Sequence, residues 1–139
     1  MVQLIVGGKG KGKTKCLLDK VNEEVKNILG NVVFLDKNEK QMYELNNRIR
    51  LINVTEFGIE TTESFIGFVA GIISQDHDLQ QIYIDSFLKV SYLEDSDISD
   101  AIARLEKLSD KYSVDMFLSV STDKQDLPEH LRSSVIISL

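Results

Sequence analysis

The sequence predicts an α/β fold: a doubly wound, mostly parallel sheet with helices on both faces. Short apolar runs alternate with amphipathic helical patterns along the chain of 139 residues, which is the arrangement of a parallel sheet with crossover helices. Several runs are continuously apolar, as expected for strands that helices cover on both sides. The length fits one domain over residues 1–139, built as a three-layer sandwich.

Six runs are expected to form the strands. The run at 32–35 reads Val-Val-Phe-Leu, and the run at 81–85 ends in Asp85. Such short apolar segments between turn residues are typical of buried strands. The complete set comprises residues 2–6, 32–35, 50–54, 81–85, 116–120 and 135–139.

Apolar residues at helical spacing predict four helices between these strands. In the third helix, Gly67 and Gly71 are spaced to permit close packing against a neighbour. We expect that neighbour to lie within the domain, with a partner-facing surface as the alternative. The four helical patterns cover residues 13–28, 42–49, 61–73 and 98–108.

The composition narrows the classes of partner. The formal net charge is −6 at pH 7, whereas proteins that hold a nucleic acid backbone carry a basic surface. Nucleic acid binding is therefore disfavoured for the isolated chain. Cys16 is the only cysteine, so no internal disulfide can form. The sequence has no signal segment and no apolar run of about 18 residues, so we expect a cytoplasmic protein without a membrane span.

The most specific motif follows the first predicted strand. Residues 7–14 read Gly-Gly-Lys-Gly-Lys-Gly-Lys-Thr and fit the phosphate-loop pattern G-x-x-x-x-G-K-[S/T] at every fixed position. The loop lies between an apolar strand and a helical pattern, which is the context this motif requires. We therefore predict a nucleoside triphosphate site that involves Gly7, Gly8, Lys9, Gly10, Lys11, Gly12, Lys13, Thr14 and Lys15.

The chemistry of phosphate binding explains the spacing. Glycines allow the positive-φ turns that point several backbone N–H groups at one phosphate. The helix that follows offers its free N–H groups and the positive end of its dipole to the same anion. Lys13 can reach the β- and γ-phosphates as a point charge, and the Thr14 hydroxyl is placed to ligate Mg²⁺.

A carboxylate at the end of another predicted strand adds a second candidate for metal binding. If the strand at 81–85 lies beside the loop, Asp85 can hold Mg²⁺, usually through water. A simple strand-ending aspartate is the alternative, and the phosphate-loop motif upstream favours the metal role. Thr14 and Asp85 are therefore the predicted Mg²⁺ ligands, and Lys13 and Asp85 are predicted catalytic residues.

With residues 7–14 and 82–86, the chain resembles the P-loop NTPases, and within them the RecA-like ATPases, in a minimal single-domain form. A looser likeness runs through residues 102–122 and 127–139. The resemblance implies a strand order across the sheet. From one edge to the other, that order is the final strand, the loop strand, 116–120, 81–85, 32–35 and 50–54.

The resemblance also implies roles outside the loop. Ser121 or Thr122 would lie near the γ-phosphate as a polar sensor. Many relatives have a glutamate directly after the Walker B aspartate to polarise the attacking water, but this chain has Ser86 there. RecA-like proteins can instead supply a glutamate from the end of the second strand. Here Glu39 is the candidate base, and Asp36 lies nearer the strand end.

The leading functional prediction is an ATP-binding protein, a Mg²⁺-dependent ATPase that acts with a partner or as an oligomer. The alternative is an ATP-binding switch or scaffold with little hydrolysis, which the missing glutamate after Asp85 favours. A small-molecule kinase is the third reading, although no arginine-rich lid is visible. No Asn-Lys-x-Asp guanine motif is present, so adenine is the expected base. An arginine from a neighbouring subunit is common in such ATPases, and Arg132 is the best candidate.

Overall fold

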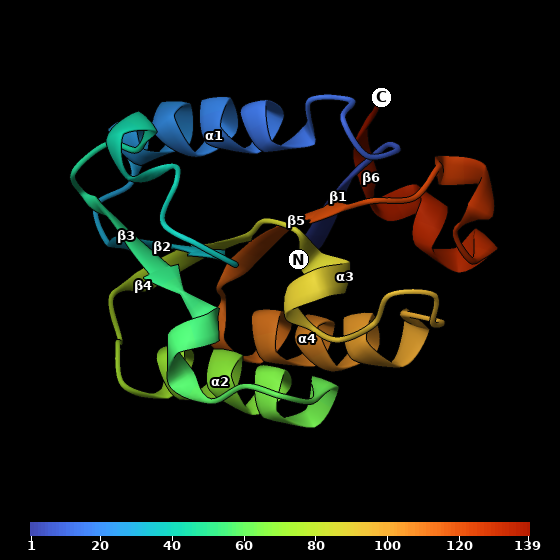
Figure 1. Cartoon of the computed structure of the whole chain (residues 1–139). Helices are drawn as coiled ribbons and strands as arrows, with labels where there is room; N and C mark the ends of the chain where they lie inside the picture. The colour runs from blue at the N-terminus through green and yellow to red at the C-terminus, as the bar shows by residue number, and fades with distance from the viewer.

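Six parallel strands form one sheet in the computed structural model, which describes residues 1–139 (Figure 1). All five neighbouring pairs are parallel. The strand order is β3-β2-β4-β5-β1-β6, so the predicted order is confirmed. The strands are β1 (Val2–Val6), β2 (Asn31–Asp36), β3 (Ile49–Asn53), β4 (Leu79–Ile84), β5 (Asp115–Val120) and β6 (Val135–Ser138).

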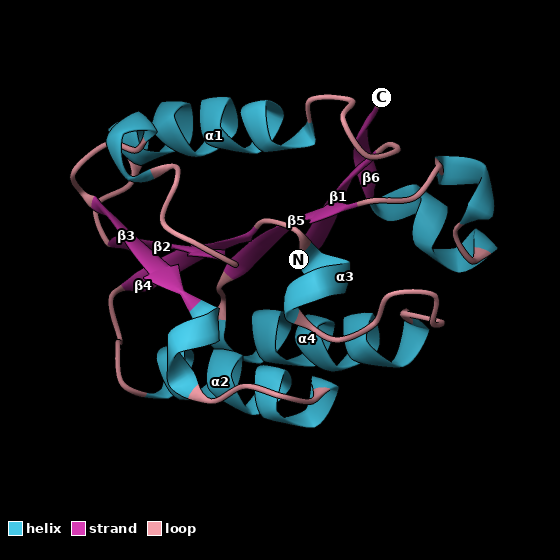
Figure 2. Ribbon diagram, viewed as in Figure 1, coloured by secondary structure: helices cyan, strands magenta, loops and turns pink.

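Helices cover both faces of this sheet (Figure 2). Helix α1 (Lys13–Glu24) lies on one face, and α2 (Thr62–Ser74) and α4 (Ser99–Tyr112) lie on the other. The short helix α3 (Phe87–Val90) directly follows β4. This arrangement confirms an α/β domain with three layers. Short 3₁₀ turns complete the chain at Val25–Asn27, Met42–Glu44, Val54–Phe57, Lys124–Asp126 and Glu129–Ser134. None of the helices has the length and apolar character needed to cross a membrane.

Alternating side chains of the strands divide the core into two apolar clusters. In β1, Ile5 belongs to the smaller cluster beneath α1, whereas Leu4 and Val6 belong to the larger cluster beneath α2 and α4. Successive strand residues point to opposite faces, so each strand contributes to both clusters. Burial on both faces explains the continuous apolar runs in the sequence.

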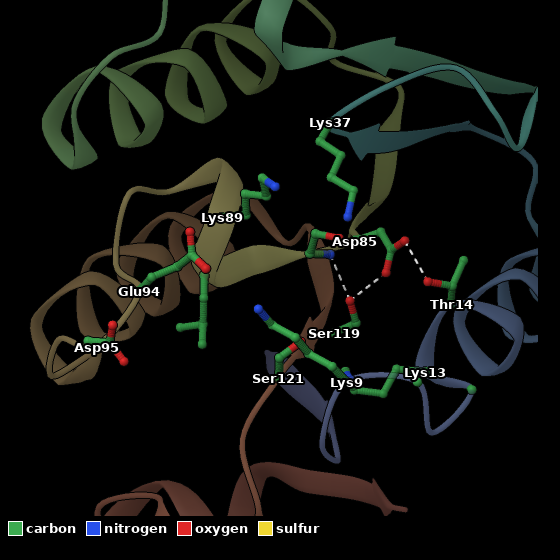
Figure 3. A pocket seen from close by; sticks show the side chains of 14 residues that line it. Lys9, Lys13, Thr14, Lys37, Asp85, Lys89, Glu94, Asp95, Ser119 and Ser121 are labelled. Atoms are coloured by element: carbon green, nitrogen blue, oxygen red, sulfur yellow. Dashed lines mark hydrogen bonds between the residues drawn. The ribbon is translucent and has the colours of Figure 1, made fainter.

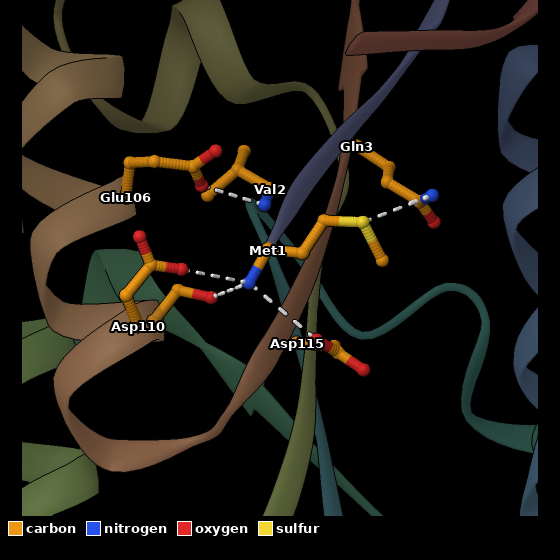
Figure 4. Close-up of polar contacts among 7 residues, drawn as sticks. Met1, Val2, Gln3, Glu106, Asp110 and Asp115 are labelled. Atoms are coloured by element: carbon orange, nitrogen blue, oxygen red, sulfur yellow. Dashed lines mark hydrogen bonds and ion pairs between the residues drawn. The ribbon is translucent and has the colours of Figure 1, made fainter.

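The beginning of β1 is held against α4 and β5 (Figure 4). The backbone N–H of Val2 donates to Glu106 Oε2 at 2.7 Å, and the Met1 nitrogen lies 3.5 Å from the carboxylates of Asp110 and Asp115. It also donates to Ser109 Oγ. These contacts fix the start of the strand whose other end carries the glycine-rich loop.

Helix α2 confirms the helix predicted at 61–73, but it does not confirm the close packing predicted at its two glycines. Thr61 caps the helix, and its side chain and that of Ser64 form a reciprocal capping box. Gly67 and Gly71, however, are exposed, and a Cβ atom added at either position would meet no atom within 4 Å. The prediction of close packing at these glycines within the domain is wrong, because the helix buries its opposite face.

The predicted helix at 42–49 is also wrong. Only the 3₁₀ turn Met42–Glu44 forms there, and Ile49 begins β3. The Asn22 side chain on α1 holds this segment in a loop, since it donates to Glu44 O at 2.7 Å and accepts from Asn46 N–H at 2.8 Å. Backbone groups that a helix would pair internally are satisfied here by a side chain.

Candidate functional site

The glycine-rich loop connects the end of β1 to the start of α1. Gly10 and Gly12 have φ angles of 78° and 94°, a conformation that side chains other than glycine rarely adopt. Gly12 directly precedes α1, so the free N–H groups of the first helical turn face the loop. The Gly7 N–H donates to Thr122 O at 2.8 Å and ties the loop to the tip of β5.

Lys13 folds back into this loop. Its side chain is only 8% exposed, and Nζ donates to Gly8 O at 2.9 Å. Burial lowers the pKa of the Lys13 ammonium, and attraction to Asp85 partly opposes that shift. The ammonium is thus held at the loop with a single hydrogen bond, to a neutral carbonyl oxygen, and can bind an anion in its place.

A hydrogen-bond network connects the loop to the carboxyl ends of β4 and β5 (Figure 3). Thr14 Oγ1 donates to Asp85 Oδ2 at 2.9 Å, and Ser119 Oγ donates to Asp85 Oδ1 at 2.5 Å. The Ser86 N–H in turn donates to Ser119 Oγ at 2.8 Å. Asp85 is 4% exposed, so both carboxylate oxygens are held in fixed directions.

These groups line a cavity of about 710 Å³ at the carboxyl ends of the strands, where parallel α/β sheets bind their ligands. Seven residues singled out in the sequence line this cavity: Lys9, Gly10, Gly12, Lys13, Thr14, Asp85 and Ser121. The structure therefore brings the loop, the strand-ending aspartate and the tip of β5 to one place. The other lining residues are Lys37, Ser86, Leu88, Lys89, Glu94, Asp95 and Ser119.

Five residues predicted for the site do not line the cavity. Gly7 and Gly8 contribute backbone hydrogen bonds, to Thr122 and from Lys13. The side chains of Lys11, Lys15 and Glu39 are exposed. Lys15 forms an ion pair with Asp19 instead, at 3.3 Å.

Arg132 is likewise outside the cavity. Its guanidinium group donates to the carbonyl oxygens of Leu127, at 3.3 Å, and Gln125, at 2.9 Å. These bonds hold the segment between β5 and β6 together.

The wall opposite the loop was not predicted. Figure 3 shows Lys37 and Lys89 on the side of the site opposite Lys9 and Lys13, and both line the cavity. Lys37 directly follows β2, and this position at a strand end was the available signal. Ser119 was also missed, although it is the only uncharged polar residue in β5.

Asp36 ends β2 beside the site without lining it. The register pairs Leu35 with Ile84, so Asp36 and Asp85 end neighbouring strands. Asp36 is 2% exposed, and burial together with the charge of Asp85 raises its pKa to about 6. The Lys37 N–H, 2.7 Å from Asp36 Oδ1, opposes that shift.

No cluster of three or more His, Cys, Asp or Glu side chains capable of holding a metal is present. A nucleotide-bound Mg²⁺ needs fewer protein ligands, because phosphate oxygens and water complete its shell. Thr14 and Asp85, hydrogen-bonded to each other at 2.9 Å, are the oxygen donors that fit it.

Comparison with known proteins does not place the chain in a family. It matches no protein-family model, and no curated protein shows significant similarity to it.

Proposed function

We propose that the chain is an ATP-binding protein of the P-loop class that uses Mg²⁺. The observation that carries this proposal is the 2.9 Å hydrogen bond between Thr14 and Asp85. It joins the loop pattern G-x-x-x-x-G-K-T to a strand-ending carboxylate 71 positions later. The agreement of the strand order with the one that the RecA-like resemblance implies also supports the proposal.

Each polar group of the loop wall has a role in this proposal. The N–H groups at the start of α1 bind phosphate oxygens, and the Lys13 ammonium exchanges Gly8 O for the β- and γ-phosphates. The Thr14 hydroxyl and the Asp85 carboxylate hold Mg²⁺, which neutralises charge between the β- and γ-phosphates when bound. Ser119 keeps Asp85 oriented, and Ser121, which lines the same cavity, is the proposed contact to the γ-phosphate.

We propose slow hydrolysis for the isolated chain. Hydrolysis needs a group that orients and deprotonates the attacking water while the bond from the γ-phosphorus to the ADP oxygen breaks. Ser86 occupies the position after Asp85, and Glu39 is outside the cavity. Besides Asp85, the carboxylates that line it are Glu94 and Asp95, both exposed. The lack of a second buried carboxylate in the cavity lining supports an ATP-binding switch, whose faster turnover depends on a partner or a second copy.

Calorimetric titration of the protein with ATP and Mg²⁺ tests the proposal. Wild-type protein is expected to bind one ATP, and Lys13→Ala to lose about a hundredfold in affinity, because a charge-assisted contact to phosphate is removed. Lys107→Ala is the matched control, since Lys107 is exposed on α4. Equal affinity of the two variants, or no binding by wild type, would contradict the proposal. Competition with GTP tests the expected preference for adenine.

A further inference from the structure

A second cavity of about 620 Å³ adjoins the one beside the loop. The two share Lys37, Lys89 and Glu94, which stand at the boundary between them. The second cavity lies between the segment after β3 and the segment after β4, and its volume falls within the usual range for small-molecule sites. The remaining residues that line it are Asn38, Val54, Thr55, Ile59, Val90 and Tyr92.

The inner wall of the second cavity is apolar and fixed. Val54, Ile59 and Val90 are at most 7% exposed and belong to the larger core cluster. Their positions are set by the core, so this wall exists before any ligand binds. Small-molecule sites typically combine such a preformed apolar wall with a few polar groups at the mouth.

Two hydrogen bonds hold the flanking segments together. The Tyr92 hydroxyl donates to Ile59 O at 2.8 Å, and Thr62 Oγ1 donates to Ser91 O at 2.7 Å. Both bonds cross from the segment after β4 to the segment after β3. They keep the two walls at a fixed separation, which lowers the conformational cost of binding.

Backbone strain is concentrated in the segment between the two cavities. Four non-glycine residues have positive φ, and three of them, Ser86, Tyr92 and Asp95, lie within ten positions of one another. Each of the three lines one of the two cavities. Such conformations are unfavourable for residues other than glycine and gather at binding sites, where surrounding contacts enforce them.

The mouth of the second cavity is suited to an anion. The Lys37 and Lys89 ammonium groups form no hydrogen bond and no ion pair within the protein. Glu94 is the only acidic residue that lines this cavity, so lysines outnumber carboxylates in its lining. The buried Asp36 carboxylate also attracts the Lys37 ammonium but does not line the cavity. An anionic group placed between the lysines would gain two charge-assisted contacts.

We propose that the second cavity binds a small organic anion with an apolar body. Its anionic head group lies between Lys37 and Lys89, and its apolar part packs against Val54, Ile59 and Val90. Because the head group lies at the boundary of the two cavities, the ligand occupies a subsite adjacent to the loop. This inference goes beyond nucleotide binding and does not require it.

Titration with phenyl phosphate, followed by amide NMR of ¹⁵N-labelled protein, tests this proposal. The backbone signals of Thr55, Ile59 and Val90 are expected to shift and to saturate at millimolar concentrations. Inorganic phosphate alone and phenol alone are expected to bind at least tenfold more weakly, because each uses one half of the site. The titration is repeated with and without ATP and Mg²⁺. The amide signals of Gly10 and Gly12 report binding at the loop, so the comparison separates the two sites.

Two variants with matched controls examine the two halves of the subsite. Lys89→Gln is expected to weaken phenyl phosphate about tenfold, as the loss of one charge-assisted contact implies, whereas Lys107→Gln is expected to leave it unchanged. Thr55→Trp fills the cavity from an exposed position and is expected to abolish the shifts at Ile59 and Val90. Glu56→Trp is its control, because Glu56 is exposed and lines neither cavity.

Three results would overturn the proposal. Shifts confined to residues 7–14 would show that the probe binds only at the loop. Equal affinity for phenyl phosphate and inorganic phosphate would show that the apolar wall is not used. Unchanged binding in both Lys89→Gln and Thr55→Trp would place the probe elsewhere. None of these results depends on whether ATP binds, so failure here is distinguishable from failure of the proposed function.

Discussion

The two walls of the cavity beside the loop are built differently. The loop wall comes from one continuous stretch, residues 7–14, in which Lys13 is bonded to Gly8 and Thr14 to Asp85, while the Lys9 ammonium is unpaired. The far wall is assembled from Lys37 after β2 and from Lys89, Glu94 and Asp95 after β4, and its lysines are unpaired. The loop wall is thus prepared for one kind of ligand, whereas the far wall offers free charge to a second.

Asp36 ends β2 beside the cavity, next to Lys37 of the far wall, and its ionisation is expected to give the largest effect on stability. Its pKa is raised from 3.8 to about 6 in the folded protein. Between these values the unfolded chain loses the proton first, so a rise in pH lowers the free energy of unfolding, by up to about 3 kcal/mol above pH 6. Below about pH 3 both states are protonated and the effect vanishes.

Asp36→Asn removes this titration. Relative to the variant, wild-type protein should lose stability as the pH rises from 4 to 7, and urea unfolding at four pH values measures the difference. Other carboxylates titrate in both proteins and cancel in the comparison. Parallel stability curves over this range would show that Asp36 is ionised normally.

Among the changes outside the loop, Asp85→Asn is expected to have the largest effect on ligand binding. The amide keeps the shape of the carboxylate but loses its charge and one acceptor oxygen, so the affinity for ATP in the presence of Mg²⁺ should fall about a hundredfold. Without Mg²⁺ the loss should be much smaller. Calorimetry in magnesium and in EDTA measures both, with Asp123→Asn as an exposed control. Equal losses in the two buffers would argue against a metal role.

Ser119→Ala is expected to have an intermediate effect. The change removes the hydrogen bond to Asp85 and leaves the Ser86 N–H without its acceptor, at a cost of about 1–3 kcal/mol in the free energy of unfolding. Affinity for ATP with Mg²⁺ should fall several-fold as Asp85 loses its fixed orientation. Chemical unfolding and calorimetry measure the two quantities, and Ser133→Ala, at an exposed position, is the control. An unchanged affinity in a destabilised protein would limit Ser119 to a structural role.

Glu39→Gln is expected to have the smallest effect, less than twofold on the rate of phosphate release, because the side chain is exposed and outside the cavity. Glu94→Gln, which changes a carboxylate that lines the far wall, is the comparison. A loss of tenfold or more in the rate of phosphate release in Glu39→Gln, but not in Glu94→Gln, would support Glu39 as the catalytic base. It would also require the segment after β2 to move.

The predictable parts of the molecule are those that depend on local pattern. Buried parallel strands are recognisable as continuous apolar runs, because both of their faces are covered. The loop is recognisable because phosphate binding requires contiguous residues at fixed spacing. The position of the strand that leads to Asp85, between β2 and β5, was predicted from the resemblance to RecA-like ATPases and not from local pattern. The hydrogen bond between Asp85 and Thr14 then follows from the strand order, which brings the ends of β1 and β4 to the same edge of the sheet.

The parts that were missed depend on contacts between distant segments. Three apolar residues at helical spacing predicted a helix at 42–49, but Asn22, on another element, stabilises a loop there. Lys37 and Lys89 meet only because β2 and β4 are neighbours in the sheet. Lys37 follows a predicted strand, but Lys89 belongs to no local pattern, so their common wall could not be derived from spacing along the chain.

A crystal structure with Mg²⁺ and a nonhydrolysable ATP analogue is the decisive test of nucleotide binding at the loop. We expect the triphosphate in the loop at residues 7–14, Lys13 Nζ within hydrogen-bond distance of the β- or γ-phosphate, and Thr14 and Asp85 at the metal. A nucleotide bound elsewhere, or a loop that stays empty at saturating nucleotide with Lys13 still bonded to Gly8, would contradict this expectation.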